Sequence, residues 1–191
     1  MKLDENINYI VSGLERSGTS MLMQIINAGN FPLGFDNSRP ADMSNPKGYY
    51  ELEGGKIINK LMEGSFPFEN YKGKFIKITS FGLKFLPPGR YKIIYSERDI
   101  EEILDSMEKM IGQKDMNRED TKISFLKLND MIKQSIKERE DIDVLFTNYN
   151  EMLLNPKNTI FRILNFLDVP RSIQGQMVKV VDNRLYRQRR K

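Results

Sequence analysis

The segment VSGLERSGTSML, at residues 11–22, lies between two patterned stretches of the chain. Before it, INYIVS at residues 7–12 is apolar and β-branched, which predicts a buried strand. After it, TSMLMQIINA places apolar side chains at helical spacing as far as Gly29. A glycine-rich loop between a strand and a helix points several backbone N–H groups and the positive helix end at one spot. Such a spot suits a phosphate group.

The loop departs from the sequence that binds ATP or GTP. That sequence, GxxxxGK[ST], uses its lysine on the β and γ phosphates and its hydroxyl on magnesium. Here Gly13 and Gly18 keep the spacing, but Thr19 stands where the lysine belongs, and the positive charge is on Arg16. The loop can still hold a phosphate without the usual equipment for a triphosphate and magnesium. Taken alone, it is also compatible with a tight strand-to-helix turn.

Strand and helix patterns alternate along the rest of the chain. Further strands are expected at 74–80, 91–96 and 143–148. Helices are expected at about 51–63, 99–111 and 120–138, and from Pro156 through NTIFRILNFL. This order predicts an α/β protein: a three-layer P-loop-like fold with a mainly parallel sheet flanked by helices. The pair Gly54-Gly55 weakens the first of these helices.

Composition limits the classes of protein. The chain has 191 residues, of which 39% are hydrophobic and 29% charged, so we expect one domain, 1–191. No apolar run is long enough to span a bilayer, and the N-terminal segment lacks a signal-peptide pattern, so we expect a cytoplasmic protein. Cysteine and histidine are absent, which excludes disulfides, thiolate zinc sites and an imidazole base. A general base must be Asp, Glu, Lys or Tyr.

The positive charge is concentrated at the C-terminal end. The segment RLYRQRRK, at 184–191, carries five cationic side chains, and without them the net charge of +4 would become −1. A basic tail is usually solvated, and a nucleic-acid arm is the alternative. Because basic and aromatic residues do not interleave elsewhere, we do not expect nucleic acid as a partner.

A second candidate phosphate contact lies in IIYSERDIEEILDSM, residues 93–107. Arg98 directly follows the predicted strand, and Ser106 comes eight residues later, about two helical turns along the next helix. Ligands of open α/β sheets bind outside the carboxyl ends of the strands, where these two side chains can meet a second phosphate. The alternative is that Arg98 pairs with nearby carboxylates and Ser106 is a solvated helix residue.

Together the two segments resemble the family of sulfotransferases that use 3′-phosphoadenosine 5′-phosphosulfate (PAPS) as donor. The loop is similar to the family's [KR]SGT[ST] motif, and its Arg form is most like tyrosylprotein sulfotransferases and small bacterial members. The resemblance implies that the 5′-phosphosulfate is held by Arg16, Ser17, Gly18, Thr19 and Ser20. It implies that Arg98 and Ser106 hold the 3′-phosphate.

A third match extends the resemblance to about residue 170. The segment VLFTNYNEMLLNPKNTIFRILNFLDVP, at 144–170, is similar to the family's YExLLxNPxxTxxxIxxFL pattern, with Asn150 where Glu is usual. Tyr149 falls at the predicted strand-to-helix corner, where it can line the nucleotide site. The alternative is a core tyrosine with its hydroxyl at the surface.

The resemblance also implies catalytic residues. A lysine on the strand before the 3′-phosphate strand touches the transferring sulfuryl group in the family, and here that is Lys77. The cytosolic enzymes have a catalytic His two residues later, where this chain has Thr79. The segment NPKGYYELE, at 45–53, is similar to an NPxGYxE stretch of small bacterial members and favours Glu51 as the base. Glu53 and Asp42 are the next candidates for the base. The alternative is that Glu51 only favours the N-terminus of its helix.

The expected function is transfer of a sulfuryl group from PAPS to a hydroxyl or amine acceptor, in line and without a metal. The C-terminal RKG element of the cytosolic enzymes has no clear match, and Arg184, Arg187 or the residues after them are a hypothetical substitute. Two alternatives stay open: an atypical P-loop kinase or NTPase, and a non-catalytic nucleotide-binding protein of the same fold.

The acceptor pocket is expected from residues 31–73 and 111–121, where the sequence is least patterned. Aromatic side chains make an apolar pocket possible there, and core packing explains them equally well. They are Phe31, Phe35, Tyr49, Tyr50, Phe66, Phe68 and Tyr71.

Overall fold

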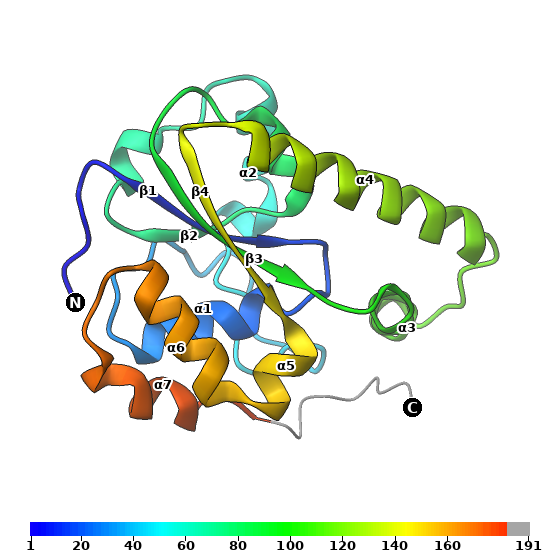
Figure 1. The fold of residues 1–191 in the computed structure, drawn as a ribbon. Coiled ribbons are helices and arrows are strands. Elements are labelled where there is room, and N and C mark those ends of the chain that lie inside the picture. The colour runs from blue at the N-terminus through cyan, green and yellow to red at the C-terminus, as the bar shows by residue number, and fades with distance from the viewer. Residues whose placement is uncertain (183–191) are drawn as a thin grey trace.

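The computed structural model describes residues 1–182 and is built around a parallel four-stranded sheet (Figure 1). The strands are β1 (Asn8–Gly13), β2 (Phe75–Lys77), β3 (Tyr91–Glu97) and β4 (Ile142–Asn148), in the order β2-β1-β3-β4. Every neighbouring pair is parallel. The sheet confirms the α/β fold class with a mainly parallel sheet flanked by helices.

Helices cover both faces of the sheet (Figure 1). One face carries α1 (Thr19–Ala28), α5 (Tyr149–Leu154), α6 (Pro156–Phe166) and α7 (Gln174–Lys179). The other carries α2 (Ile57–Met62) and α4 (Arg118–Glu138). Helix α3 (Ile100–Ile111) follows the carboxyl end of β3. Short 3₁₀ helices are η1 (Glu53–Gly55), η2 (Phe68–Tyr71), η3 (Ser80–Phe85) and η4 (Arg171–Ile173).

Successive side chains along the strands belong alternately to two hydrophobic clusters, one on each face of the sheet. Tyr9 and Val11 of β1 pack with α1, α6 and α7, whereas Ile10 between them packs with α2 and α4. This alternation follows from the pleat, which points successive side chains to opposite faces. Because both faces are covered, the central strand β1 is buried along its whole length, as parallel strands inside a sheet are.

Two predicted boundaries were wrong. The strand expected at 74–80 ends at Lys77, because the chain turns after Thr79 into η3, which buries Leu83 against α2. The helix expected at 51–63 is broken: η1 and α2 are separate, and Gly54 and Gly55 have φ of +63° and +87°. A left-handed backbone cannot continue a right-handed helix, so the glycine pair stops it.

The parallel topology gathers the predicted site at one edge of the sheet. Gly13 ends β1, Lys77 ends β2, Arg98 follows β3 and Tyr149 follows β4. The carboxyl ends of parallel strands meet at the same edge, which is where open α/β sheets bind ligands. The basic tail at 184–191, with Arg184 and Arg187, lies outside the described residues. Within residues 1–182, no helix has the length and apolar character needed to cross a membrane.

Candidate functional site

A cavity of about 890 Å³ opens at this edge of the sheet. Its size falls in the range of small-molecule sites, roughly 300 to 1,000 Å³. The predicted site residues that line it are Arg16, Gly18, Thr19, Ser20, Glu51, Lys77, Arg98, Ser106 and Tyr149. The fold therefore brings together every predicted site residue except the side chain of Ser17.

The loop between β1 and α1 adopts a conformation that its glycines permit. Gly13 and Gly18 have φ of +148° and +106°, and Arg16 between them has φ of +65°. A Cβ on Gly18 would lie 2.3 Å from Cδ2 of Tyr149. No side chain caps the N-terminus of α1, and its first turn contains no acidic residue. The first N–H groups of α1 are thus open to an anion at the cavity wall.

Ser17 turns away from the cavity. Its Oγ is buried and has no hydrogen-bond partner among residues 1–182. Its N–H donates to Leu14 O at 3.1 Å, and its carbonyl accepts from Ser96 Oγ at 2.7 Å. Ser17 therefore shapes the loop from within, and its side chain does not reach a ligand in the cavity.

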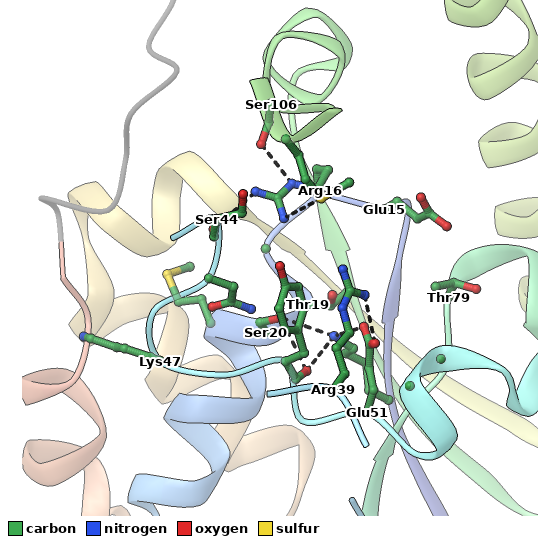
Figure 2. A pocket seen from close by; sticks show the side chains of 18 of the residues that line it. Glu15, Arg16, Thr19, Ser20, Arg39, Ser44, Lys47, Glu51, Thr79 and Ser106 are labelled. Atoms are coloured by element: carbon green, nitrogen blue, oxygen red, sulfur yellow. Dashed lines mark hydrogen bonds and ion pairs between the residues drawn. The ribbon is translucent and has the colours of Figure 1, made fainter. Parts of the chain in front are cut away.

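The Arg16 side chain bridges the loop and α3 (Figure 2). Its Nε donates to Ser106 Oγ at 3.0 Å, and its Nη2 donates to Ser44 O at 3.5 Å. Ser106 is only 8% exposed, so it is not a solvated helix residue. The guanidinium thus links the loop predicted to hold the 5′-phosphosulfate to the serine predicted to hold the 3′-phosphate.

Arg98 contacts a carboxylate, a loop carbonyl and an aromatic ring. Its Nε pairs with Glu102 Oε2 at 3.0 Å, its Nη1 donates to Arg16 O at 3.0 Å, and its guanidinium lies 4.4 Å from the centre of the Tyr149 ring. The carboxylate pairing that sequence reasoning left open is present, and Arg98 nevertheless lines the cavity. Burial raises the pKa of Tyr149 above its ordinary value. Its ring packs between the arginine and the loop.

Lys77 joins the loop to the candidate base. Its Nζ pairs with Glu51 Oε1 at 2.7 Å and donates to Tyr49 O at 2.6 Å and to Ser20 Oγ at 3.2 Å. The lysine side chain is 5% exposed and the glutamate 11%. Burial lowers the pKa of Lys77 below its ordinary value, and the charge of Glu51 opposes that shift. The ammonium group of Lys77 therefore contacts both the carboxylate of Glu51 and the hydroxyl of Ser20 in the [KR]SGT[ST] motif.

The Sulfotransferase domain family model matches residues 6–191 of the chain. The chain belongs to the sulfotransferase family. The match confirms the resemblance indicated by the loop, the Arg98 segment and the 144–170 segment. A search of curated proteins by sequence gave no match.

Solved structures support the same fold for this sulfotransferase-family chain. A retinol dehydratase in complex with androsterone and inactive cofactor PAP is 18% identical, with a TM-score of 0.55 over 95% of this chain and 64% of its own. A mouse sulfotransferase complexed with PAP is 16% identical, with a TM-score of 0.56 over 98% and 68%. The sulfotransferase domain of the Synechococcus PCC 7002 olefin synthase is 16% identical, with a TM-score of 0.53 over 96% and 83%. The chain thus spans about two thirds of the length of the first two.

Arg39 is a site residue that sequence reasoning missed. Its Nη1 pairs with Glu51 Oε2 at 3.0 Å, and its guanidinium lies 3.6 Å from the centre of the Tyr49 ring (Figure 2). The Tyr49 hydroxyl donates to the Asp42 carboxylate at 2.8 and 2.9 Å. Arg39 lies in an unpatterned loop, where no periodicity or motif marks it. Both oxygens of Glu51 are therefore paired with cations.

The other candidate bases stay outside the cavity. Glu53 pairs with the exposed Lys60, and Asp42 holds Tyr49. Neither carboxylate lines the cavity, whereas Glu51 does. Glu51 precedes η1, and its carboxylate pairs with Lys77 and Arg39, contacts that a role limited to favouring a helix N-terminus does not explain. Thr79, which replaces the cytosolic enzymes' His, lines the same cavity.

Most of the aromatic residues considered for an acceptor pocket form the core instead. Phe31, Phe66 and Phe68 are buried in the two hydrophobic clusters. Of the seven aromatic residues named, Tyr49 lines the cavity. The apolar part of the cavity wall comes from other side chains, among them Ile58, Met62 and Phe81. Core packing therefore explains most of these aromatic side chains.

Proposed function

We propose that this chain transfers a sulfuryl group from PAPS to a hydroxyl or amine acceptor, in line and without a metal. The observation that carries the proposal is the position of Lys77 Nζ, which contacts both Ser20 of the loop and Glu51. A transfer enzyme needs a cation where donor and acceptor meet and a base beside it. The Lys77 contacts supply both within one cluster.

The loop end of the cavity suits the donor. The open N-terminus of α1, with Thr19 and Ser20, is assigned to the 5′-phosphosulfate. Ser106 and Arg98 are assigned to the 3′-phosphate, with Arg16 between the two phosphate groups. The retinol dehydratase and the mouse sulfotransferase of the same fold were crystallised with PAP, which supports a bisphosphate nucleotide here.

In the proposed reaction the acceptor oxygen or nitrogen attacks the sulfur of PAPS. A new bond to sulfur forms as the bond from sulfur to the 5′-phosphate oxygen breaks, and that oxygen keeps the electron pair. The acceptor proton passes to Glu51. Charge develops on the departing oxygen, where Arg16, Lys77 and the loop N–H groups offset it.

Glu51 is held ready for this role by its two cations. Lys77 occupies one carboxylate oxygen and Arg39 the other. A carboxylate oxygen has two lone pairs and accepts more than one hydrogen bond, so the acceptor N–H or O–H can join either oxygen without displacing a cation. The two cations fix the rotamer of the carboxylate, which lowers the entropic cost of reaching a reactive geometry.

Nucleotide binding separates the proposal from its alternatives. We expect 3′,5′-adenosine bisphosphate without magnesium, at a hundred times its Kd, to raise the melting temperature by roughly 5 to 10 °C. ATP with magnesium should raise the melting temperature by a smaller amount, because the loop lacks the lysine that NTPases use to bind the β and γ phosphates. Stabilisation by magnesium-ATP alone would favour a kinase or NTPase.

Binding of PAPS without transfer to any acceptor would favour a non-catalytic protein. Transfer is measured with radiolabelled PAPS across sugars, phenols, lipids, peptides and amines.

Glu51→Gln tests the base. With an acceptor found in that screen, we expect kcat to fall by about 10² to 10⁴, the typical contribution of general base catalysis. The amide oxygen can still accept from Lys77 or Arg39, so donor affinity should change little.

Glu53→Gln is the matched control for this prediction. It removes a carboxylate two residues away that pairs with Lys60 outside the cavity. Its kcat should stay within about twofold of the wild-type value. Equal kcat values for the Glu51 and Glu53 variants would rule out Glu51 as the base.

A further inference from the structure

Ser96 contacts the loop between β1 and α1 on the side away from the cavity. It is the sixth residue of β3, is 3% exposed, and is not part of the cavity wall. Its Oγ donates to Ser17 O at 2.7 Å. This side chain therefore acts on the loop backbone and cannot touch a ligand in the cavity.

The packing of β1 on β3 brings the hydroxyl to this position. Ser96 is paired with Gly13 in the register of the two strands. A Cβ on Gly13 would lie 2.5 Å from Ser96 O and 3.3 Å from Ser96 Cβ. Only a residue without a side chain permits this approach, so Gly13 places Ser96 directly under the loop.

The hydrogen bond sets the direction of one peptide plane. In a trans peptide, the C=O of one residue and the N–H of the next point in opposite directions. Because Ser96 holds the carbonyl of Ser17, the N–H of Gly18 points the other way, out of the N-terminus of α1. Arg98 holds the preceding carbonyl, that of Arg16, at 3.0 Å. Two successive loop carbonyls are thus fixed from the end of β3.

We propose that Ser96 is a positioning residue that orients the N–H of Gly18 toward the 5′-phosphate of the nucleotide. The inference rests on the proposed function, because it assumes a nucleotide at this loop. Ser96 gives a cleaner test than Arg98, which lines the cavity and is itself assigned to the 3′-phosphate.

The Kd values of three nucleotides distinguish a positioning role of Ser96 from a role in stabilising the fold as a whole. In Ser96→Ala, we expect the Kd values of adenosine 5′-phosphate and 3′,5′-adenosine bisphosphate to rise about three- to tenfold, as for loss of one hydrogen bond. The Kd of adenosine 3′-phosphate should stay nearly unchanged, because that ligand lacks the 5′-phosphate toward which the N–H of Gly18 is proposed to point. Ser96→Cys keeps a weak donor of similar size and should lie between wild type and Ser96→Ala. It carries the test if the alanine variant does not fold.

Ser12→Ala is the matched control. Ser12 is a buried serine on β1 whose Oγ has no hydrogen-bond partner within the described part of the chain. Its loss should leave all three Kd values unchanged. In protein labelled with ¹⁵N-glycine, Ser96→Ala should shift the Gly18 amide resonance, and Ser12→Ala should not.

Two results would overturn the inference while the proposed function stands. One is wild-type affinity of Ser96→Ala for the 5′-phosphate ligands. The other is an equal loss for all three nucleotides, which indicates a purely structural role. Absence of bisphosphate binding by the wild-type chain would instead overturn both the inference and the proposed function.

Discussion

Arg16→Ala is expected to abolish measurable sulfuryl transfer and to leave the fold intact. The guanidinium bonds Ser106 and the Ser44 carbonyl inside the cavity, where it is assigned to the charge of the departing phosphate. Loss of one such electrostatic contact typically lowers kcat by about 10² to 10³, and Arg16 also links the two phosphate positions. Turnover is measured with radiolabelled PAPS, and the fold by circular dichroism and the melting temperature.

The backbone at Arg16 provides a control that separates activity from stability. With φ of +65°, any residue other than glycine there bears a steric cost of roughly 1 to 2 kcal/mol. Arg16→Gly should therefore be at least as stable as Arg16→Ala, yet equally inactive. Arg16→Lys keeps the charge but loses the fork of donors, so its kcat should fall between wild type and alanine. Near-normal turnover in Arg16→Ala would refute the assignment of this residue.

The fold was predictable because its signals are local. The apolar run at 7–12, the loop and the helical spacing after Thr19 each specify one element, and alternating elements imply a parallel sheet. The elements that were missed are short. Helices α5 and α7 have six residues each, too few for a helical period to stand out. Both helices pack against α6, and their boundaries depend on this packing. The packing cannot be inferred from the spacing of residues in the sequence.

The candidate site was predictable only where a motif or strand end marks a residue. Arg16 lies in the loop, Lys77 ends β2 and Arg98 follows β3, and the parallel topology brings them to one edge. Arg39 carries no such mark, and Ser96, although it ends the strand expected at 91–96, belongs to no motif. Arg39 reaches Glu51 from an unpatterned loop, and Ser96 acts through a hydrogen bond to a backbone carbonyl. Contacts of that kind depend on three-dimensional distance and not on spacing along the chain.

Gly18→Ala is expected to have the largest effect on stability and to weaken nucleotide binding severely. Its φ of +106° disfavours any side chain, and the new Cβ would lie 2.3 Å from Cδ2 of the Tyr149 ring. Backbone strain and overpacking together should lower the free energy of unfolding by roughly 2 to 5 kcal/mol. If Tyr149 moves to relieve the clash, Arg98 loses the ring that it stacks on. Chemical denaturation and titration with 3′,5′-adenosine bisphosphate measure the two effects.

Two further variants identify the cause of this loss. Gly175→Ala in α7 places a Cβ in open space at ordinary φ, so it should be neutral or stabilise by about 0.5 to 1 kcal/mol. In a Tyr149→Ala background the clash is removed, and Gly18→Ala should cost only the backbone strain of roughly 1 to 2 kcal/mol. A cost unchanged by Tyr149→Ala would show that the ring does not restrict Gly18. Wild-type stability of Gly18→Ala would show that the loop does not need the left-handed backbone at Gly18, and the N–H groups assigned to the 5′-phosphosulfate would then lack their structural basis.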